Sequence, residues 1–219
     1  SISMSLINFE YLDKKFNLID TPGYIDFVGE MKAGLGVADL AGIVVNASEG
    51  IEVGTELAWE FSSNNETAKF IVINMCDRDQ SDFDKSLNAL KKRFGRQIFP
   101  INFPLEQGAG FNKIADVLKR EILDFSKDSS GNFSTEQADD ATKNKLNIIL
   151  QRFGIEEFYP SIGNHISKEI GVNPISSIPS KQENIIGTIK EVLKPGMRMN
   201  IGNDIKIIKE SEISVFSKE

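Results

Sequence analysis

The stretch "FNLIDTPGYIDFVGEM", residues 16–31, decides the fold. It opens as an apolar strand that ends at Asp20, and Gly23 follows three residues later. From Asp26 onwards, apolar residues recur at helical spacing, so a strand, a short loop and a helix are predicted in that order. A carboxylate at the carboxyl end of a buried strand lies where open α/β sheets bind their ligands.

The same alternation of strands and helices continues to about residue 103. A β-hairpin with a half-buried first strand is predicted from residues 4–11 and 16–19, because both runs are β-like and a turn at Asp13 and Lys14 separates them. Strands that alternate with helices favour an α/β fold with a largely parallel sheet and helices on both faces. The further predicted strands are residues 40–45, 70–73 and 98–103, and the predicted helices are residues 26–38, 55–61 and 83–94.

The pattern changes after residue 125. Residues 126–145 are mostly polar and predict a linker or a mobile segment, while residues 146–153 resemble a short helix and 158–160 a short strand. From about residue 180, β-like runs at 185–189 and 204–208 predict a small β module. Its turn signals are Lys194-Pro195-Gly196 and Gly202-Asn203.

Composition excludes several classes of protein. The chain has 219 residues, 40% of them hydrophobic, and a net charge of −7, so it lacks the strongly basic character of many nucleic-acid-binding proteins. No apolar stretch is long enough to cross a bilayer, so no membrane partner is expected. Cys76 is the single cysteine, which excludes an internal disulfide and fits a cytoplasmic protein.

The loop after Asp20 has the chemistry of a phosphate site. Asp20 can hold Mg²⁺, because that ion prefers carboxylate, water and phosphate oxygens. Gly23 can donate its backbone N–H to a terminal phosphate, because no Cβ stands in the way. The alternative is an ordinary strand–helix loop in which Asp20 caps the helix, and the D-x-x-G pattern alone does not decide between the two.

A second loop favours the phosphate interpretation. The predicted strand at residues 70–73 ends in Asn74-Met75-Cys76-Asp77. A carboxylate such as that of Asp77 can accept two N–H bonds from the edge of a guanine, and a base without that donor pair would leave the carboxylate unpaired. Two such loops in this order, one strand–helix unit apart, are a more specific indication of a nucleotide site than either loop alone.

With both loops in place, the chain resembles the translational GTPases, and among them elongation factor G and its elongation-factor-G-like relatives. The resemblance rests on the stretches "SISMSL", "NLIDTPGYIDFVGEM", "VADLAGIVVNASEGIEVGTELAWE" and "IVINMCDRD". It continues through "LKKRFGRQIFPINFPLEQG" and, more loosely, "FYPSIGNHISKEIGVNPI".

The resemblance implies a fold and a domain division. It implies an α/β, P-loop GTPase-like G domain with a mostly parallel sheet and helices on both faces, incomplete at its N-terminus. Residues 1–180 would form this partial G domain, with 126–155 as an inserted or mobile subdomain region. Residues 181–219 would form the start or remnant of a β-barrel domain.

The resemblance also implies the site residues. Asp20, Thr21, Pro22 and Gly23 match the second-switch D-x-x-G. Asn74, Met75, Cys76 and Asp77 match the base-binding N-K-x-D. The implied cofactors are GTP or GDP and Mg²⁺, and the implied partner of a monomeric protein is the ribosome, with its RNA and its proteins. Further residues implied at the site are Asn164, His165 and Ile166 as a base-contacting loop, and Ser1 as a hydroxyl that senses Mg²⁺.

Three departures from the family pattern leave two functions open. No G-x-x-x-x-G-K-[ST] phosphate loop is present, and the family places it before Ser1. The chain is then a fragment, or begins inside a longer polypeptide, or receives the missing strand from another chain. Tyr24 replaces the usual catalytic histidine, and Met75 replaces a lysine. One expectation is therefore a GTP-dependent switch on the ribosome, with slow or altered GTP hydrolysis in the full-length protein; the alternative is a non-enzymatic module that docks a partner without nucleotide.

Overall fold

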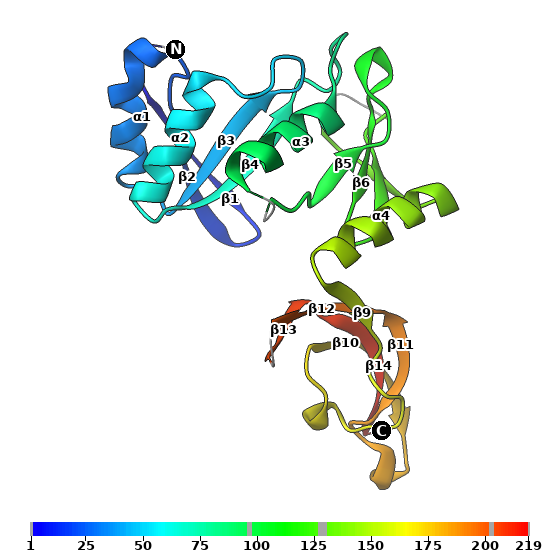
Figure 1. Cartoon of the computed structure of the whole chain (residues 1–219). Helices are drawn as coiled ribbons and strands as arrows, with labels where there is room; N and C mark the ends of the chain where they lie inside the picture. The colour runs from blue at the N-terminus through cyan, green and yellow to red at the C-terminus, as the bar shows by residue number, and fades with distance from the viewer. Residues whose placement is uncertain (1, 96–97, 127–130, 202–203, 219) are drawn as a thin grey trace. The chain divides into compact units, whose positions relative to one another are not determined.

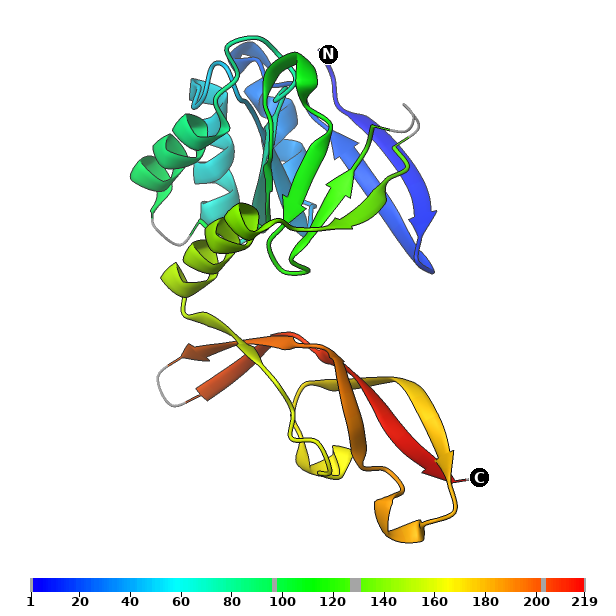
Figure 2. The same cartoon turned by 90° about the vertical axis from the view of Figure 1, so that its right-hand side faces the viewer.

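The computed structural model describes residues 2–95, 98–126, 131–201 and 204–218. Contacts divide the chain into two compact units. Figures 1 and 2 draw the helices and strands of both units. The first unit consists of Ser1–Ile98 and Pro104–Asn112, and the second of Phe99–Phe103 and Lys113–Glu219.

The first unit begins with the predicted hairpin. Strand β1 (Ser5–Tyr11) pairs antiparallel with β2 (Lys14–Asp20) in a two-stranded sheet. The two turn residues, Leu12 and Asp13, both have positive φ, as a tight hairpin turn requires. The first strand was expected to be half-buried and the second to be buried, but every residue of β1 is exposed and only Ile19 of β2 is partly buried. The prediction fails because alternation shows which face is apolar, and not whether another element covers it.

The parallel sheet predicted from the sequence is confirmed for the next two strands. Strand β3 (Leu40–Asn46) runs parallel to β4 (Ala68–Asn74) in continuous register, so that Asn46 lies opposite Asn74. Helix α2 (Val53–Asn64) connects these two strands, and helix α3 (Phe83–Phe94) follows β4.

The hydrophobic core of this unit lies between the parallel strands and the two helices. Ile43 and Val45 of β3 and Leu90 of α3 are almost fully buried. Partly buried side chains of both helices pack against them, among them Trp59 of α2 and Phe94 of α3. The opposite face of β3, which carries Val44, is exposed. These elements confirm the α/β class.

The helices begin and end for local reasons. After β2, the chain forms a 3₁₀ turn η1 (Ile25–Phe27) and helix α1 (Val28–Leu35), which ends earlier than predicted, at a glycine-rich stretch. The capping box of α2 joins the side chains and backbone of Glu52 and Thr55. Helix α3 is capped by Asp82, which accepts a hydrogen bond of 2.8 Å from the Lys85 amide.

The second unit begins with a four-stranded sheet. Its strands, in sheet order, are β5 (Asn102–Pro104), β6 (Lys113–Asp116), β7 (Glu121–Asp124) and β8 (Ser134–Gln137). The strand predicted at residues 98–103 is thus shorter and later, and it begins after Pro100, which cannot donate to a ladder. A short 3₁₀ turn, η2 (Gly108–Gly110), precedes β6 and belongs to the first unit.

The linker predicted at residues 126–145 is partly wrong. Strand β8 lies inside it, and helix α4 (Asp140–Arg152) begins inside it. The helix is capped by Asp139, whose carboxylate accepts a hydrogen bond of 2.8 Å from the Thr142 amide, and it buries Leu146 and Leu150. Because its first turn is polar, the composition suggested a linker. Residues 127–130 lie outside the described part of the chain.

The remaining strands form two three-stranded sheets. One has the order β10–β14–β11 and the other β13–β12–β9. The predicted turn at residues 194–196 joins β11 to β12, whereas the turn predicted at 202–203 lies outside the described residues. The elements are β9 (Ile155–Phe158), η3 (Ile166–Lys168), β10 (Val172–Ser180), η4 (Glu183–Ile185), β11 (Ile189–Lys194), β12 (Gly196–Ile201), β13 (Asp204–Lys209) and β14 (Ser211–Lys218).

These pairings bear on the predicted domain division. Strand β9 pairs with β12, and β10 pairs in parallel with β14, so strands on both sides of residue 180 share the same sheets. The division into 1–180 and 181–219 remains a prediction. Among the described residues, no helix is both long enough and apolar enough to span a membrane.

One buried carboxylate in the second unit gives a prediction about acid stability. Hydrogen bonds from Ser126 and the nearby Lys113 ammonium, 3.4 Å away, lower the pKa of Asp124 from 3.8 to about 2. A carboxyl with a lowered folded-state pKa stabilises the fold above its unfolded pKa, and this stabilisation is lost as pH falls towards the folded value. Between pH 5 and pH 2, the unfolding free energy of the wild type is expected to fall more than that of Asp124→Asn.

The measurement is denaturant unfolding at several pH values across that window. Asp140→Asn is the matched control, because the Asp140 side chain is 98% exposed. Parallel pH profiles for the wild type and Asp124→Asn would contradict the assignment.

Candidate functional site

The first predicted loop lies directly after β2. Asp20 ends the strand and is exposed, while Pro22 is buried and anchors the loop. Gly23 is exposed, and a Cβ built on it meets nothing within 4 Å. The loop therefore presents a carboxylate and an open backbone on the same short segment, as a phosphate and its metal require.

The alternative role for Asp20, as a helix cap, is not found. The residue at the N-cap of η1 is Tyr24, and that of α1 is Phe27, and neither cap has a side-chain hydrogen bond. The Tyr24 carbonyl accepts a hydrogen bond of 3.0 Å from the Phe27 amide, and its side chain is 73% exposed. Tyr24 thus stands at the start of the helical segment with its phenol in solvent.

The second predicted loop follows β4. Its centre is Cys76, whose side chain is buried and whose carbonyl accepts hydrogen bonds from the Gly108 amide at 2.8 Å and the Ser81 hydroxyl at 2.9 Å. Met75 has a φ of 61° and is 42% exposed, and Asp77 is exposed. The loop is therefore fixed from inside through Cys76, while the side chains on either side of it face outwards.

The Cys76 thiol is a structural group in this loop. Its Sγ donates to the Ile73 carbonyl at 3.5 Å. Burial, and secondarily the charge of Asp77, raises the pKa of the Cys76 thiol. A thiol with a raised pKa forms less thiolate and reacts less readily with oxidants.

Both loops contact the segment that follows β3. The Ala47 amide donates a hydrogen bond of 2.9 Å to the Asn74 carbonyl, at the start of the second loop. The carbonyl of Gly23, in the first loop, lies against Gly54 at the start of α2. The structure thus connects the Asp20–Gly23 loop and the Asn74–Asp77 loop through one short stretch of chain.

The third predicted group lies in the second unit. The Asn164 carbonyl accepts from the Ile189 amide at 2.8 Å, and the Ile166 amide donates to the Gly187 carbonyl at 3.0 Å. The His165 ring accepts a hydrogen bond of 3.2 Å from the Ser167 amide and caps η3. Asn164, His165 and Ile166 therefore help to hold the β module together, and their contact with a base remains a prediction.

The metal assignment rests on the first loop. Ser1 lies outside the described residues. In the part of the chain that the structure describes, no three His, Cys, Asp or Glu side chains cluster as a metal site. A single carboxylate such as Asp20 fits Mg²⁺ in a nucleotide site, because phosphate oxygens and water supply the other ligands.

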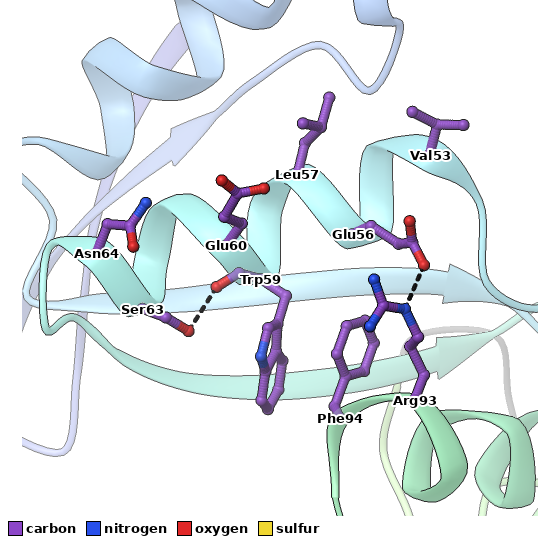
Figure 3. A pocket seen from close by; sticks show the side chains of 9 residues that line it. All are labelled: Val53, Glu56, Leu57, Trp59, Glu60, Ser63, Asn64, Arg93 and Phe94. Carbon is purple, nitrogen blue, oxygen red and sulfur yellow. Dashed lines mark hydrogen bonds and ion pairs between the residues drawn. The ribbon is translucent and has the colours of Figure 1, made fainter.

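A pocket is lined by residues of α2 and α3. It has a volume of about 440 Å³ and contains none of the predicted site residues. Figure 3 shows the rings of Trp59 and Phe94 side by side, with centroids 4.4 Å apart, and Arg93 ion-paired to Glu56 at 2.5 Å. The hydrogen bond to Glu56 raises the pKa of the Arg93 guanidinium. These contacts hold the two helices together.

These features define a class of protein. An α/β unit in which β2 ends in a D-x-x-G loop and β4 ends in an N-x-x-D loop has the features of a nucleotide-binding domain of the GTPase type. The family model of the elongation factor Tu GTP binding domain matches residues 1–203. The chain belongs to this family of guanine-nucleotide-binding domains.

Individual relatives agree with the family. The chain is 32% identical over 128 residues to the elongation factor G-like protein of Thermotoga maritima, which covers 58% of this chain and 19% of that protein. It is 31% identical over 164 residues to the mitochondrial ribosome-releasing factor 2 of Drosophila sechellia, covering 72% of this chain and 24% of that protein. The chain thus spans less than a quarter of the length of these two relatives.

A solved structure is also similar to this chain. The crystal structure of a protein from Thermus thermophilus matches 69% of this chain and 22% of its own chain, with a TM-score of 0.62 and 26% sequence identity. The predicted resemblance to the elongation factor G group and the predicted G-domain class are both confirmed.

Proposed function

We propose that this chain is the guanine-nucleotide-binding part of a translation factor of the elongation factor G type. GTP holds the Asp20–Gly23 loop in an ordered state, the ribosome senses that state through its RNA and proteins, and hydrolysis releases it. The observation that carries the proposal is that both loops are tied to the segment after β3, with Asp20 and Asp77 exposed. The protein acts as a cytoplasmic monomer.

Each loop residue has a role in this proposal. The Asp77 carboxylate accepts the two N–H groups of guanine, and the apolar side chain of Met75 covers the base, with Asn74 and Cys76 holding the loop in place. Gly23 donates its N–H to the terminal phosphate, while Thr21 and Pro22 fix the backbone. Mg²⁺, held by Asp20, neutralises phosphate charge when it is bound.

In this proposal the terminal phosphate is bound by the Gly23 N–H, and Tyr24 is the next residue in the chain. Its exposed phenol can donate one hydrogen bond and accept another, which is enough to hold a water molecule. A phenol lacks the basic ring nitrogen of an imidazole, so hydrolysis is slow. The proposed enzyme is therefore a GTPase in which Tyr24 orients water inefficiently.

Co-sedimentation with ribosomes tests the proposed function. The full gene product is expected to sediment with ribosomes in a non-hydrolysable GTP analogue and to remain in the supernatant in GDP. Sedimentation that is equal in both nucleotides, or absent in both, would refute a GTP-dependent switch on the ribosome.

The alternative is a docking module that binds no nucleotide, and it is supported by Met75 and Tyr24, which depart from the family pattern. The genomic DNA upstream of the Ser1 codon discriminates the two. A phosphate-loop sequence in frame there contradicts the alternative, whereas a stop codon followed by a start site supports it.

A further inference from the structure

Helix α2 contains a glycine, Gly54, at a position where most other residues would stabilise the helix more. Gly54 is the second residue of α2. Glycine is among the poorest helix formers, and alanine among the best. Gly54 does not have the positive φ that would favour glycine. Its backbone conformation therefore does not explain why a glycine is present.

The neighbouring loop supplies the explanation. A Cβ built on Gly54 would lie 2.9 Å from the carbonyl oxygen of Gly23, closer than real Cβ contacts. That oxygen is a backbone atom, so this steric clash could be relieved only by a shift of the Asp20–Gly23 loop itself. Gly29, in α1, is different, because a Cβ there meets nothing within 4 Å. Only the absence of a side chain at residue 54 lets the loop lie against α2.

The first turn of α2 is itself held in place. The segment 46–54, which joins β3 to this turn, is fixed at its start by the hydrogen bond from the Ala47 amide to the Asn74 carbonyl. The Ala47 carbonyl accepts from the Asp82 amide at 3.2 Å and from the Ser86 hydroxyl at 3.1 Å. At the other end, the capping box of Glu52 and Thr55 fixes the helix start. The contact at Gly54 thus places the first loop relative to the second.

We propose that Gly54 is a positioning residue of the nucleotide site. It seats the Asp20–Gly23 loop against α2, and so sets where the Gly23 N–H meets the terminal phosphate of a nucleoside triphosphate while the base lies on the Asn74–Asp77 loop. The proposal rests on the proposed nucleotide-binding function. It assigns to Gly54 the preference of the site for a triphosphate over a diphosphate, and leaves the choice of base to Asp77.

The test compares Gly54→Ala with Gly29→Ala in the full gene product. Both variants replace a helical glycine by a better helix former, so both are expected to fold. Gly54→Ala is expected to weaken binding of a non-hydrolysable GTP analogue about tenfold, as the loss of one hydrogen bond to a charged group would. Its affinity for GDP stays near that of the wild type. Gly29→Ala leaves both affinities unchanged, and an unchanged ratio of the two affinities in Gly54→Ala overturns the proposal.

A second measurement separates this proposal from the proposed function. In nucleotide-free protein, amide hydrogen exchange at Gly23 and Tyr24 is expected to be faster in Gly54→Ala than in the wild type or Gly29→Ala. Unchanged exchange shows that Gly54 does not seat the loop and overturns the inference. If the wild type binds neither nucleotide, the proposed function fails, and the exchange rates still decide whether Gly54 positions the loop.

Discussion

Asp77→Asn is expected to lower the affinity of the full gene product for GTP about 100-fold, because a hydrogen bond to a charged group contributes roughly 1.5–3 kcal/mol. It is also expected to raise affinity for xanthosine triphosphate. The physical reason is the pattern of donors on the base. A carboxylate accepts two N–H groups from guanine, whereas an amide offers one acceptor oxygen and an NH₂ donor group, which suits the carbonyl that xanthine carries in place of the amino group. The measurement is equilibrium titration with fluorescent GTP and xanthosine triphosphate analogues.

The control for this experiment is Asp79→Asn. Asp79 is exposed and lies two residues further along the same loop, so the substitution makes the same change in charge. It is expected to leave both affinities near the wild-type values. An equal loss in both variants would mean that general charge, and not contact with the base, governs binding.

Tyr24→His is expected to raise the rate of GTP hydrolysis on the ribosome about 100-fold, the lower end of what a positioned acid–base group contributes. An imidazole can accept a proton or a hydrogen bond from the attacking water at neutral pH. Residue 24 can accommodate a histidine because the Tyr24 side chain is 73% exposed. Single-turnover hydrolysis with saturating ribosomes measures the effect and separates it from nucleotide binding.

Tyr11→His provides the comparison for that variant. Tyr11 is 63% exposed on the hairpin, away from the loop, so the same exchange there is expected to leave hydrolysis unchanged. A rate that does not rise in Tyr24→His would show that residue 24 does not reach the attacking water.

Local patterns in the sequence predicted much of the fold. The hairpin, the parallel pair and helix α3 each have a hydrophobic period that does not depend on distant contacts. Helix α4 was missed in its first turns, because the Asp139 cap and a polar face resemble a linker in composition. The exposed β1 was missed for a different reason: alternation predicts an apolar face but says nothing of what covers it.

The candidate site, like the fold, could be predicted from the sequence only in part. The Asp20–Gly23 and Asn74–Asp77 loops were predictable, since each stands at the end of an apolar strand. Gly54 was not, because its function depends on a backbone atom of Gly23, far away in the sequence. The available signal was a glycine in the first turn of a predicted helix, where propensity argues against it.

The central claim is that one loop binds a phosphate with its metal while its neighbour selects guanine. Competitive titration of the full gene product with fluorescent GTP and ATP analogues, with and without Mg²⁺, tests it most directly. We predict a preference for GTP of about 100-fold and a marked loss of affinity when Mg²⁺ is removed. Equal affinity for the two nucleotides would contradict the claim.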